Sequence, residues 1–147
     1  MANEVNIELV QVDGSTIIAK ANSGHWVVMD SDTDFGGYDS ATKPFELFLV
    51  SLAGCTAIDV ISILKKMHIP LRKLKIELNA PRRNKYPKIP TKIDIKYIFE
   101  GENLPKENLE KAIKLSQDKY CAVSAVIKQA GIPINWIYEI KQAPPVF

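Results

Sequence analysis

The residues with the most reactive side chains in this sequence are two cysteines, and the first lies in an unusual place. Cys55 falls inside the run from Glu46 to Lys66, ELFLVSLAGCTAIDVISILKK, which is almost continuously apolar. If this run is a helix, residues three or four positions apart lie along one side. One side then collects five polar or reactive residues, which we name the polar line: Ser51, Cys55, Asp59, Ser62 and Lys66.

Two interpretations of Cys55 follow from this position. A free cysteine is usually a small core residue. Buried polar groups without partners cost about 1–3 kcal/mol each, however, so a buried polar line tends to face a cavity, water or a reacting group. The charge of Asp59 would raise the thiol pKa of Cys55. A reactive Cys55 therefore needs a cation or a hydrogen-bond donor from another segment, and we expect Asp59 to make a structural hydrogen bond to a neighbouring segment or subunit.

The second cysteine, Cys121, begins the run CAVSAVIKQAG, which is predicted to be helical. In the first turn of a helix, N–H groups without helical partners stabilise a thiolate, and Lys119 adds positive charge. The alternative is again a buried small residue. Neither cysteine lies in a CxxC or Cys/His spacing, so we expect no zinc site and no other bound metal or cofactor.

The elements that must position these cysteines are predicted in the order βββ-α-ββ-αα-β, an α+β fold. Asp13-Gly14 is typical of a hairpin turn. Proline suits a first helical turn, so the long helix begins at Pro44, and it ends before Pro70. Alternating residues and turn residues place the strands at 5–12, 15–21, 25–30, 72–80, 91–101 and 132–140, and the later helices near 105–117 and 121–131.

The long helix is apolar nearly all round, so it must be covered on all sides. We expect one sheet of about six strands, and this sheet alone cannot cover both faces of the helix. The other helices or a second copy of the chain must cover the rest, and we expect an obligate homodimer with this helix at its centre. A membrane span is rejected because Asp59 at mid-bilayer would cost about 2.5–3.5 kcal/mol.

The bulk properties exclude several classes of protein. The 147 residues are enough for one domain, predicted over 1–147, and the net charge of +2 indicates neither a nucleic-acid nor a membrane partner. The N-terminal residues show no secretory signal, so we expect a cytoplasmic protein with reduced thiols.

A basic hairpin around Tyr86 fits either a small anion site or a solvated loop, and its basic residues are Arg82, Arg83, Lys85, Lys88 and Lys92.

Two motifs together resemble the OsmC/Ohr family, named for osmotically inducible protein C and organic hydroperoxide resistance protein. KPFELFLVSLAGCTAIDV resembles the family's Pro-x-Glu-Leu helix ending in Ala-Gly-Cys, and KYCAVSAVIKQAGIPI resembles its second cysteine segment. The element order also matches, and the broader OsmC-like branch is the nearer resemblance. The resemblance implies an intertwined homodimer, in which antiparallel sheets wrap the long central apolar helices.

The resemblance also implies roles for three residues. Cys55 resembles the peroxidatic cysteine, whose thiolate attacks the O–O bond of a hydroperoxide and becomes a sulfenic acid. Cys121 resembles the resolving cysteine, which forms a disulfide that a small or protein-bound dithiol then reduces. Glu46 is the catalytic glutamate candidate, although it stands one position later than the glutamate of well-understood members.

The activating cation is the part of the family pattern without a matching residue. Well-understood members use an N-terminal arginine, whereas the first arginine here is Arg72. The candidate replacements are Lys20, His25, Arg82 and Arg83. The leading hypothesis is a two-cysteine peroxidase that acts on organic hydroperoxides or hydrogen peroxide. The alternatives are a non-catalytic dimeric module that binds a small thiol or acyl ligand, and an anion-binding protein that uses the basic hairpin.

Overall fold

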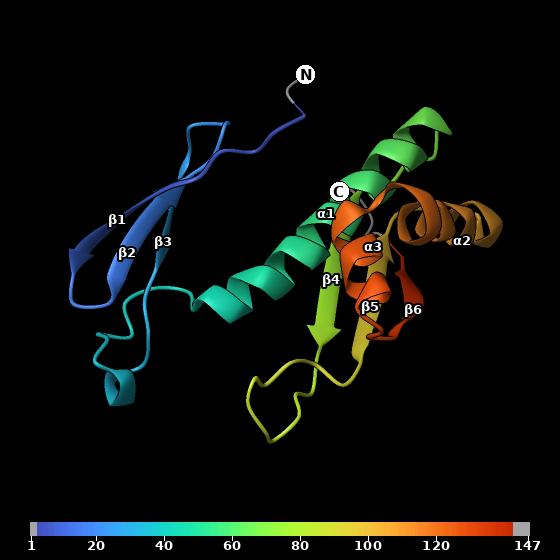
Figure 1. Ribbon diagram of the computed structural model, residues 1–147. Helices are drawn as coiled ribbons and strands as arrows, with labels where there is room; N and C mark the ends of the chain where they lie inside the picture. The colour runs from blue at the N-terminus through green and yellow to red at the C-terminus, as the bar shows by residue number, and fades with distance from the viewer. Residues whose placement is uncertain (1–2, 143–147) are drawn as a thin grey trace. The chain divides into compact units, whose positions relative to one another are not determined.

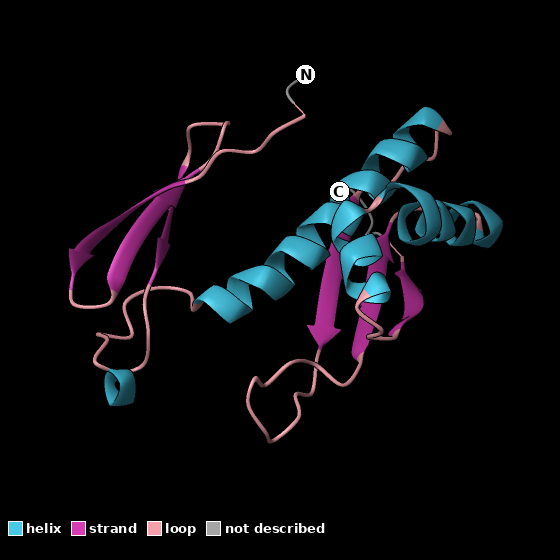
Figure 2. Ribbon diagram, in the orientation of Figure 1, coloured by secondary structure: helices cyan, strands magenta, loops and turns pink. Residues whose placement is uncertain are grey.

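The computed structural model describes residues 3–142, which divide into two compact units after Phe48. Each unit contains one sheet, and the long helix α1 (Pro44–Lys66) begins in the first unit and continues in the second (Figures 1 and 2). The six predicted strands are all present in the described residues, but they form two three-stranded sheets rather than the single sheet that we expected. The α+β class and the predicted order of helices and strands are confirmed.

The first unit is a meander of three antiparallel strands. Its strands are β1 (Glu8–Asp13), β2 (Thr16–Lys20) and β3 (Trp26–Met29), in that order across the sheet. The predicted hairpin turn is confirmed, and Gly14 has a φ of 56°, which a residue without a Cβ adopts at little cost. The following loop contains a short 3₁₀ helix, η1 (Thr33–Phe35), which the sequence did not predict.

A buried carboxylate holds this loop together. Asp30 accepts hydrogen bonds from the hydroxyls of Ser15 (2.8 Å) and Ser40 (2.7 Å) and from the backbone N–H groups of Ser31 (2.7 Å) and Tyr38 (3.0 Å). The hydrogen bond from the Ser40 hydroxyl is the largest cause that holds the Asp30 pKa far below its usual range, and burial opposes it. Asp30 is therefore a structural residue.

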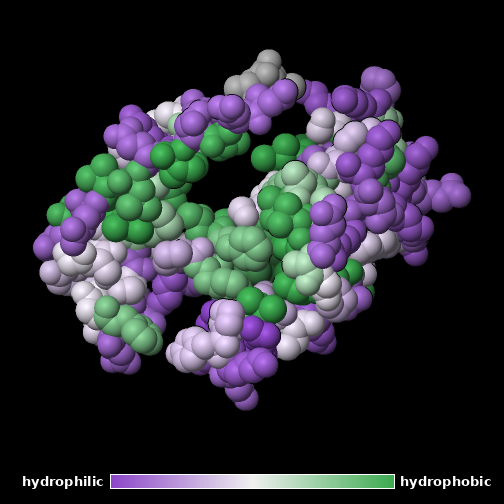
Figure 3. Space-filling model, in the orientation of Figure 1, coloured by the Kyte–Doolittle hydropathy of each residue, from purple (hydrophilic) through white to green (hydrophobic). Residues whose placement is uncertain are grey.

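Hydrophobic side chains of the first sheet are largely exposed. Among the described residues, every buried hydrophobic residue belongs to the second unit. Figure 3 shows hydrophobic side chains gathered over the first sheet. The large exposed ones before and within its strands are Val5, Ile7, Leu9, Val10, Val12, Trp26, Val27 and Val28. A small sheet is stabilised when one apolar face is covered, and in the described residues the apolar side chains of this sheet are largely exposed.

Helix α1 buries one face within the chain. Its buried residues recur every fourth position and are Leu52, Thr56, Val60 and Leu64. Its other sides expose large hydrophobic residues, among them Ile58, which is 70% exposed. Within the described residues, α1 therefore has one buried side, and large hydrophobic residues are exposed on its other sides. By length and composition alone α1 could cross a membrane, which is weak evidence because core helices pass the same test.

The second unit contains a mixed sheet. Strand β5 (Ile93–Glu100) lies between β4 (Lys73–Asn79), with which it pairs antiparallel, and β6 (Ile134–Lys141), with which it pairs parallel. The parallel pair differs from the antiparallel sheet that we expected. The reason is the helical connection between β5 and β6, because a crossover of this kind returns the chain to the end where the previous strand began.

This helical connection closes the core of the second unit. It consists of α2 (Lys106–Leu115), the π-helical turn η2 (Ser116–Tyr120) and α3 (Ala122–Gln129). Alternate residues of β5, from Ile93 to Phe99, are buried. They form one hydrophobic cluster with residues of α1, α2 and α3, whose buried members include Leu52, Val60, Leu64, Leu109, Ile113 and Ile127.

Candidate functional site

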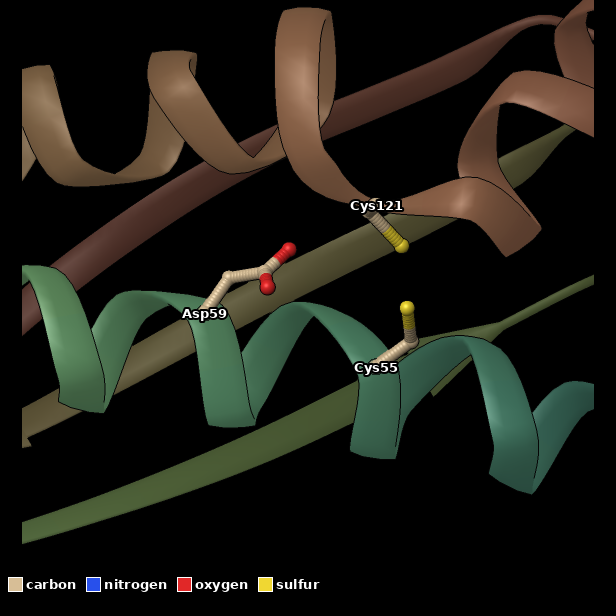
Figure 4. Close-up of side chains that lie close together, drawn as sticks. All are labelled: Cys55, Asp59 and Cys121. Atoms are coloured by element: carbon tan, nitrogen blue, oxygen red, sulfur yellow. The ribbon is translucent and has the colours of Figure 1, made fainter. Parts of the chain in front are cut away.

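The two cysteines lie together in the second unit, although they are far apart in the sequence. Cys55 comes from α1, and Cys121 is the N-cap residue of α3. Their sulfur atoms point toward one another, with the carboxylate of Asp59 beside them (Figure 4). The two sulfurs and a carboxylate oxygen of Asp59 all lie within 4.8 Å of one another, and both thiols are free. Cys121 is buried, whereas Cys55 and Asp59 are partly exposed.

The first turn of α3 directs its N–H groups at this pair of sulfurs. The Cys121 sulfur accepts a hydrogen bond from the N–H of Ser124 at 3.4 Å, and the Cys55 sulfur accepts one from the N–H of Val123. Such N–H groups have no partner inside the helix. The predicted position of Cys121 at the start of a helix is thus confirmed, and the same helix end also provides a donor to Cys55.

The pKa of the Cys55 thiol is raised above its usual value. Burial is the largest cause, followed by the hydrogen bond with Cys121 and the negative charges of Cys121 and Asp59. The N–H of Val123 acts in the opposite direction. Asp59 raises the pKa of Cys55, as the sequence predicted. Cys55 is therefore mostly a protonated thiol at neutral pH in this arrangement.

No cation is among the strongest influences on the Cys55 pKa within the described residues. The basic residues proposed from the sequence make contacts of other kinds: Lys20 with Glu8, Arg83 with the Pro87 carbonyl, and Lys119 with the ring of Tyr120. The donor that the sequence analysis required for Cys55 is thus a backbone N–H.

A chain of buried hydrogen bonds ends at Asp59. The Ser116 hydroxyl donates to Asp59 Oδ2 at 2.9 Å, which confirms the structural hydrogen bond predicted for Asp59. Because that proton points at Asp59, the contact between Ser116 and Thr56 (2.8 Å) takes its proton from Thr56. The Thr56 hydroxyl then accepts from Tyr97 at 2.7 Å, and Gln117 Nε2 donates to Tyr97 at 3.0 Å. The donors therefore all point in one direction, toward the carboxylate.

The π-helical turn η2 brings two members of this chain into the core. The N–H of Cys121 donates to the Ser116 carbonyl at 2.8 Å, a bond that spans five residues. Ser116 and Gln117 are buried as a result. A π turn inside a helical segment frequently marks a functional site. Two side-chain atoms of the described site region, Gln117 Oε1 and Ser124 Oγ, are buried without a hydrogen-bond partner.

The sequence indicated part of this site. Cys55, Cys121 and Asp59 are together, whereas the other members of the polar line, Ser51, Ser62 and Lys66, are exposed. It missed the hydroxyl and amide residues of the hydrogen-bond chain, Thr56, Tyr97, Ser116 and Gln117. A usable signal did exist for Thr56, which is a polar residue on the buried stripe of α1, four residues after Leu52.

Glu46 makes contacts at the start of α1. Its Oε1 accepts a hydrogen bond from the N–H of Lys43 at 3.1 Å and lies 3.7 Å from Lys43 Nζ. This N–H belongs to the residue before the helix and has no helical partner, so Glu46 forms half of a capping box. The catalytic role predicted for Glu46 stays a prediction.

Comparison with known proteins places the chain in a family. The family model described as OsmC-like protein matches residues 37–137. Protein YhfA of Escherichia coli (strain K12) is 33% identical over 132 residues, which are 90% of this chain and 95% of that protein.

Solved structures share the fold. A hypothetical protein from Aquifex aeolicus VF5 has a TM-score of 0.83 at 33% identity, covering 97% of this chain and 100% of that one. An organic hydroperoxide resistance protein from Elizabethkingia anophelis has a TM-score of 0.63 at 14% identity, covering 97% and 99%, and this likeness shows the fold alone. On the match to the family model and to YhfA, the chain belongs to the OsmC-like protein family.

Proposed function

We propose that this protein is a thiol-dependent peroxidase that reduces organic hydroperoxides or hydrogen peroxide in defence against oxidative stress. The observation that carries the proposal is the pair of facing sulfurs at the N-terminus of α3, both of which accept a backbone N–H. Family membership supports a role in redox stress, as does the fold shared with an organic hydroperoxide resistance protein.

The first half-reaction takes place at Cys55, the partly exposed sulfur. Its thiolate attacks one oxygen of the peroxide, an S–O bond forms, and the O–O bond breaks. The cysteine becomes a sulfenic acid, and the other oxygen leaves as an alkoxide that takes a proton from solvent and becomes an alcohol. For hydrogen peroxide this second product is water. Sulfur loses two electrons, and the peroxide gains them.

The second half-reaction uses Cys121. Its sulfur attacks the sulfenic sulfur of Cys55, the disulfide forms, and the hydroxyl group leaves with a proton as water. The sulfurs start within 4.8 Å of each other, and a disulfide bond is about 2.05 Å long, so a small shift of the side chains and helices closes the gap. Two thiols of an external dithiol, either small or protein-bound, then reduce the disulfide by exchange and become oxidised.

The second proposed feature is a homodimer in the cytoplasm. Both α1 and the first sheet expose apolar side chains that a stable soluble protein covers, and a second copy carries the same surfaces in matching number. We propose that each chain works as a single OsmC-like domain within this dimer. A reducing compartment keeps both thiols ready for the first half-reaction.

The raised pKa of Cys55 favours a second candidate function. A thiol without a nearby cation reacts slowly with peroxide, because the thiolate is the nucleophile. The alternative is a non-catalytic dimeric module that binds a small thiol or acyl ligand beside the sulfurs. It predicts that thiols persist in the presence of peroxide and that native mass spectrometry detects a retained ligand.

The test is an oxidation assay on reduced protein. Organic hydroperoxide or hydrogen peroxide is added, free thiols are counted, and mass spectrometry after proteolysis identifies the linkage. We expect a Cys55–Cys121 disulfide in the natural sequence, a sulfenic acid trapped by a dione reagent in Cys121→Ser, and no reaction in Cys55→Ser. Thiols that survive in the natural sequence, or equal oxidation in Cys55→Ser, would overturn the peroxidase proposal.

A further inference from the structure

We propose that Cys55, Cys121 and Asp59 form a Zn²⁺ site in the reduced protein. The geometry provides three ligand atoms, two sulfurs and one carboxylate oxygen, that all lie within 4.8 Å of one another. The side chains converge in the close-up (Figure 4). They come from the middle of α1 and from the N-cap of α3, so rigid elements hold them. The proposal uses the same cysteines as the peroxidase but does not require peroxidase activity.

The ligand set and spacing suit zinc. Zn²⁺ binds thiolate at about 2.3 Å and carboxylate oxygen at about 2.0–2.2 Å, usually with tetrahedral geometry. From these bond lengths, two sulfurs on one zinc ion lie roughly 3.7 Å apart. A contraction of about 1 Å from the 4.8 Å limit lies within reach of side-chain rotation. Because zinc has no redox chemistry of its own, it can occupy a thiol pair without oxidising it.

With three protein ligands, we expect the fourth coordination position of the proposed zinc site to be open. Cys55 and Asp59 are only partly buried, so water or a small ligand can reach a metal held between them. Three protein ligands with an open fourth position are typical of catalytic or exchangeable zinc rather than of a closed structural site. We therefore expect reversible binding that chelators remove without unfolding the protein.

A second set of contacts already orients all three ligands. Ser116 donates to Asp59 Oδ2, which leaves Oδ1 for a metal. The backbone N–H groups of Val123 and Ser124 donate to the two sulfurs. Hydrogen bonds of this kind to ligand atoms fix their orientation in metal sites, and their loss typically weakens metal affinity about 10–100-fold. The cluster thus has inner ligands and the outer support that zinc sites use.

The charge of the cluster also favours a cation. Two thiolates and a carboxylate would carry three negative charges, and no cation is among the strongest influences on Cys55 in the described residues. A divalent ion neutralises most of this charge, and the thiol protons leave to solvent as the sulfurs coordinate. Zinc binding and oxidation then exclude each other, because a disulfide removes both sulfur ligands.

The experiment titrates reduced, metal-free protein under argon with Co²⁺ as a spectroscopic probe, followed by displacement with Zn²⁺ in competition with a chelating dye. We expect one metal ion per chain and an absorption band from sulfur-to-cobalt charge transfer. Cys55→Ser and Cys121→Ser should each lower affinity at least 100-fold and weaken that band. Asp59→Asn should lower affinity about tenfold or more and keep the band, because both sulfurs remain.

Two further variants test whether the position of the carboxylate matters and whether the hydrogen bond to Asp59 supports metal binding. Asp118→Asn changes a carboxylate that pairs with Lys128 on the surface, so we expect no change in affinity. Ser116→Ala removes the hydrogen bond to Asp59, and we expect a loss of about 10–100-fold. Circular dichroism of each variant, with and without metal, verifies that the fold is retained. The disulfide form of the natural sequence provides a control with unchanged residues, and we expect it to bind no zinc.

The proposal is overturned if cobalt binds without a charge-transfer band, if either Cys→Ser variant binds as tightly as the natural sequence, or if the disulfide form does. Its failure is separable from that of the peroxidase. Protein that forms the disulfide with peroxide but binds no zinc contradicts the metal site alone. Protein that binds zinc through both sulfurs but keeps its thiols in peroxide, when metal-free, contradicts the peroxidase alone.

Discussion

The two units of this chain solve the problem of burying apolar residues in opposite ways. The second unit packs α1, α2, α3 and its sheet into one cluster, and the thiol pair and its hydrogen-bond chain lie within that cluster. The first unit has a sheet with exposed hydrophobic residues and one buried carboxylate, Asp30. One chain is therefore enough to align the two sulfurs, whereas the apolar side chains of the first sheet stay largely exposed.

The largest effect is expected from the exposed side of α1. Ile58→Glu places a charge at a position that is 70% exposed in the chain. In a monomer this change would alter the free energy of unfolding by at most about 0.5 kcal/mol. In the proposed dimer it buries an unpaired charge, so we expect dissociation or loss of folding, measured by light scattering after gel filtration. Lys114→Glu on α2 is the control, and an unchanged mass for Ile58→Glu would contradict the dimer.

A matched pair of leucine truncations measures how much each unit depends on buried apolar side chains. Leu52 in the second unit is fully buried, and Leu9 in the first sheet is 53% exposed. We expect Leu52→Ala to lower the free energy of unfolding by about 2–5 kcal/mol at any protein concentration. The loss in Leu9→Ala should be comparable only when the dimer is intact, and should therefore depend on protein concentration in chemical denaturation. A small, concentration-independent loss would show that the first sheet stays uncovered.

The sequence predicted the elements better than their pairing. Turn residues and prolines mark the ends of several elements, namely Asp13-Gly14, Pro44 and Pro70. The strands and helices next to them therefore begin and end close to the predicted positions. Local patterns carry no information about which strands share a sheet. The split into two sheets and the parallel pairing of β6 were missed for this reason.

The site was predictable from the sequence mainly at its cysteines, because their chemistry is distinctive. Cysteine chemistry and helical spacing indicated Cys55 and Asp59, and the resemblance assigned a partner sulfur in Cys121. The contributions of Ser116 and Gln117 depend on the π turn η2, which tertiary packing creates and no local motif indicates. A sequence motif such as CxxC identifies only metal ligands that are close together in the sequence. The three converging ligand atoms come from two distant segments, so the absence of CxxC gave no information about them.

The buried hydrogen-bond chain should matter more to stability than a similar hydroxyl at the edge of the core. Tyr97→Phe removes a hydroxyl that contacts Thr56 and Gln117 in the interior. We expect the free energy of unfolding to fall by about 1–3 kcal/mol, because buried donors lose their acceptor. Tyr138→Phe removes a partly buried hydroxyl that donates to Glu110, and should cost less. Equal losses in urea denaturation would mean that the chain of hydrogen bonds is not cooperative.

The pH dependence of thiol oxidation tests the electrostatics of the site. The Cys55 pKa is raised, so the thiolate fraction and the oxidation rate should increase as the pH rises through that pKa. Asp59→Asn removes one negative charge that contributes to the increase, so its rate profile should shift to lower pH. At neutral pH we expect oxidation several times faster than in the natural sequence, measured by stopped-flow thiol loss. A slower Asp59→Asn variant would show instead that Asp59 takes part in the reaction, for example as a proton acceptor.

The smallest effect is expected at Glu46, where the two units share a helix. Its observed contacts are those of a helix cap, so Glu46→Ala should lower the free energy of unfolding by about 0.5–1 kcal/mol and leave the Cys55 oxidation rate nearly unchanged. The catalytic role that the family resemblance implies predicts a fall of about 100-fold or more in that rate, because general acid–base groups contribute about 10²–10⁴-fold. Measuring stability and oxidation rate on the same sample separates the two roles. Asp39→Asn, which alters another carboxylate paired with Lys43, is the control that changes the same ion-pair cluster without touching the cap.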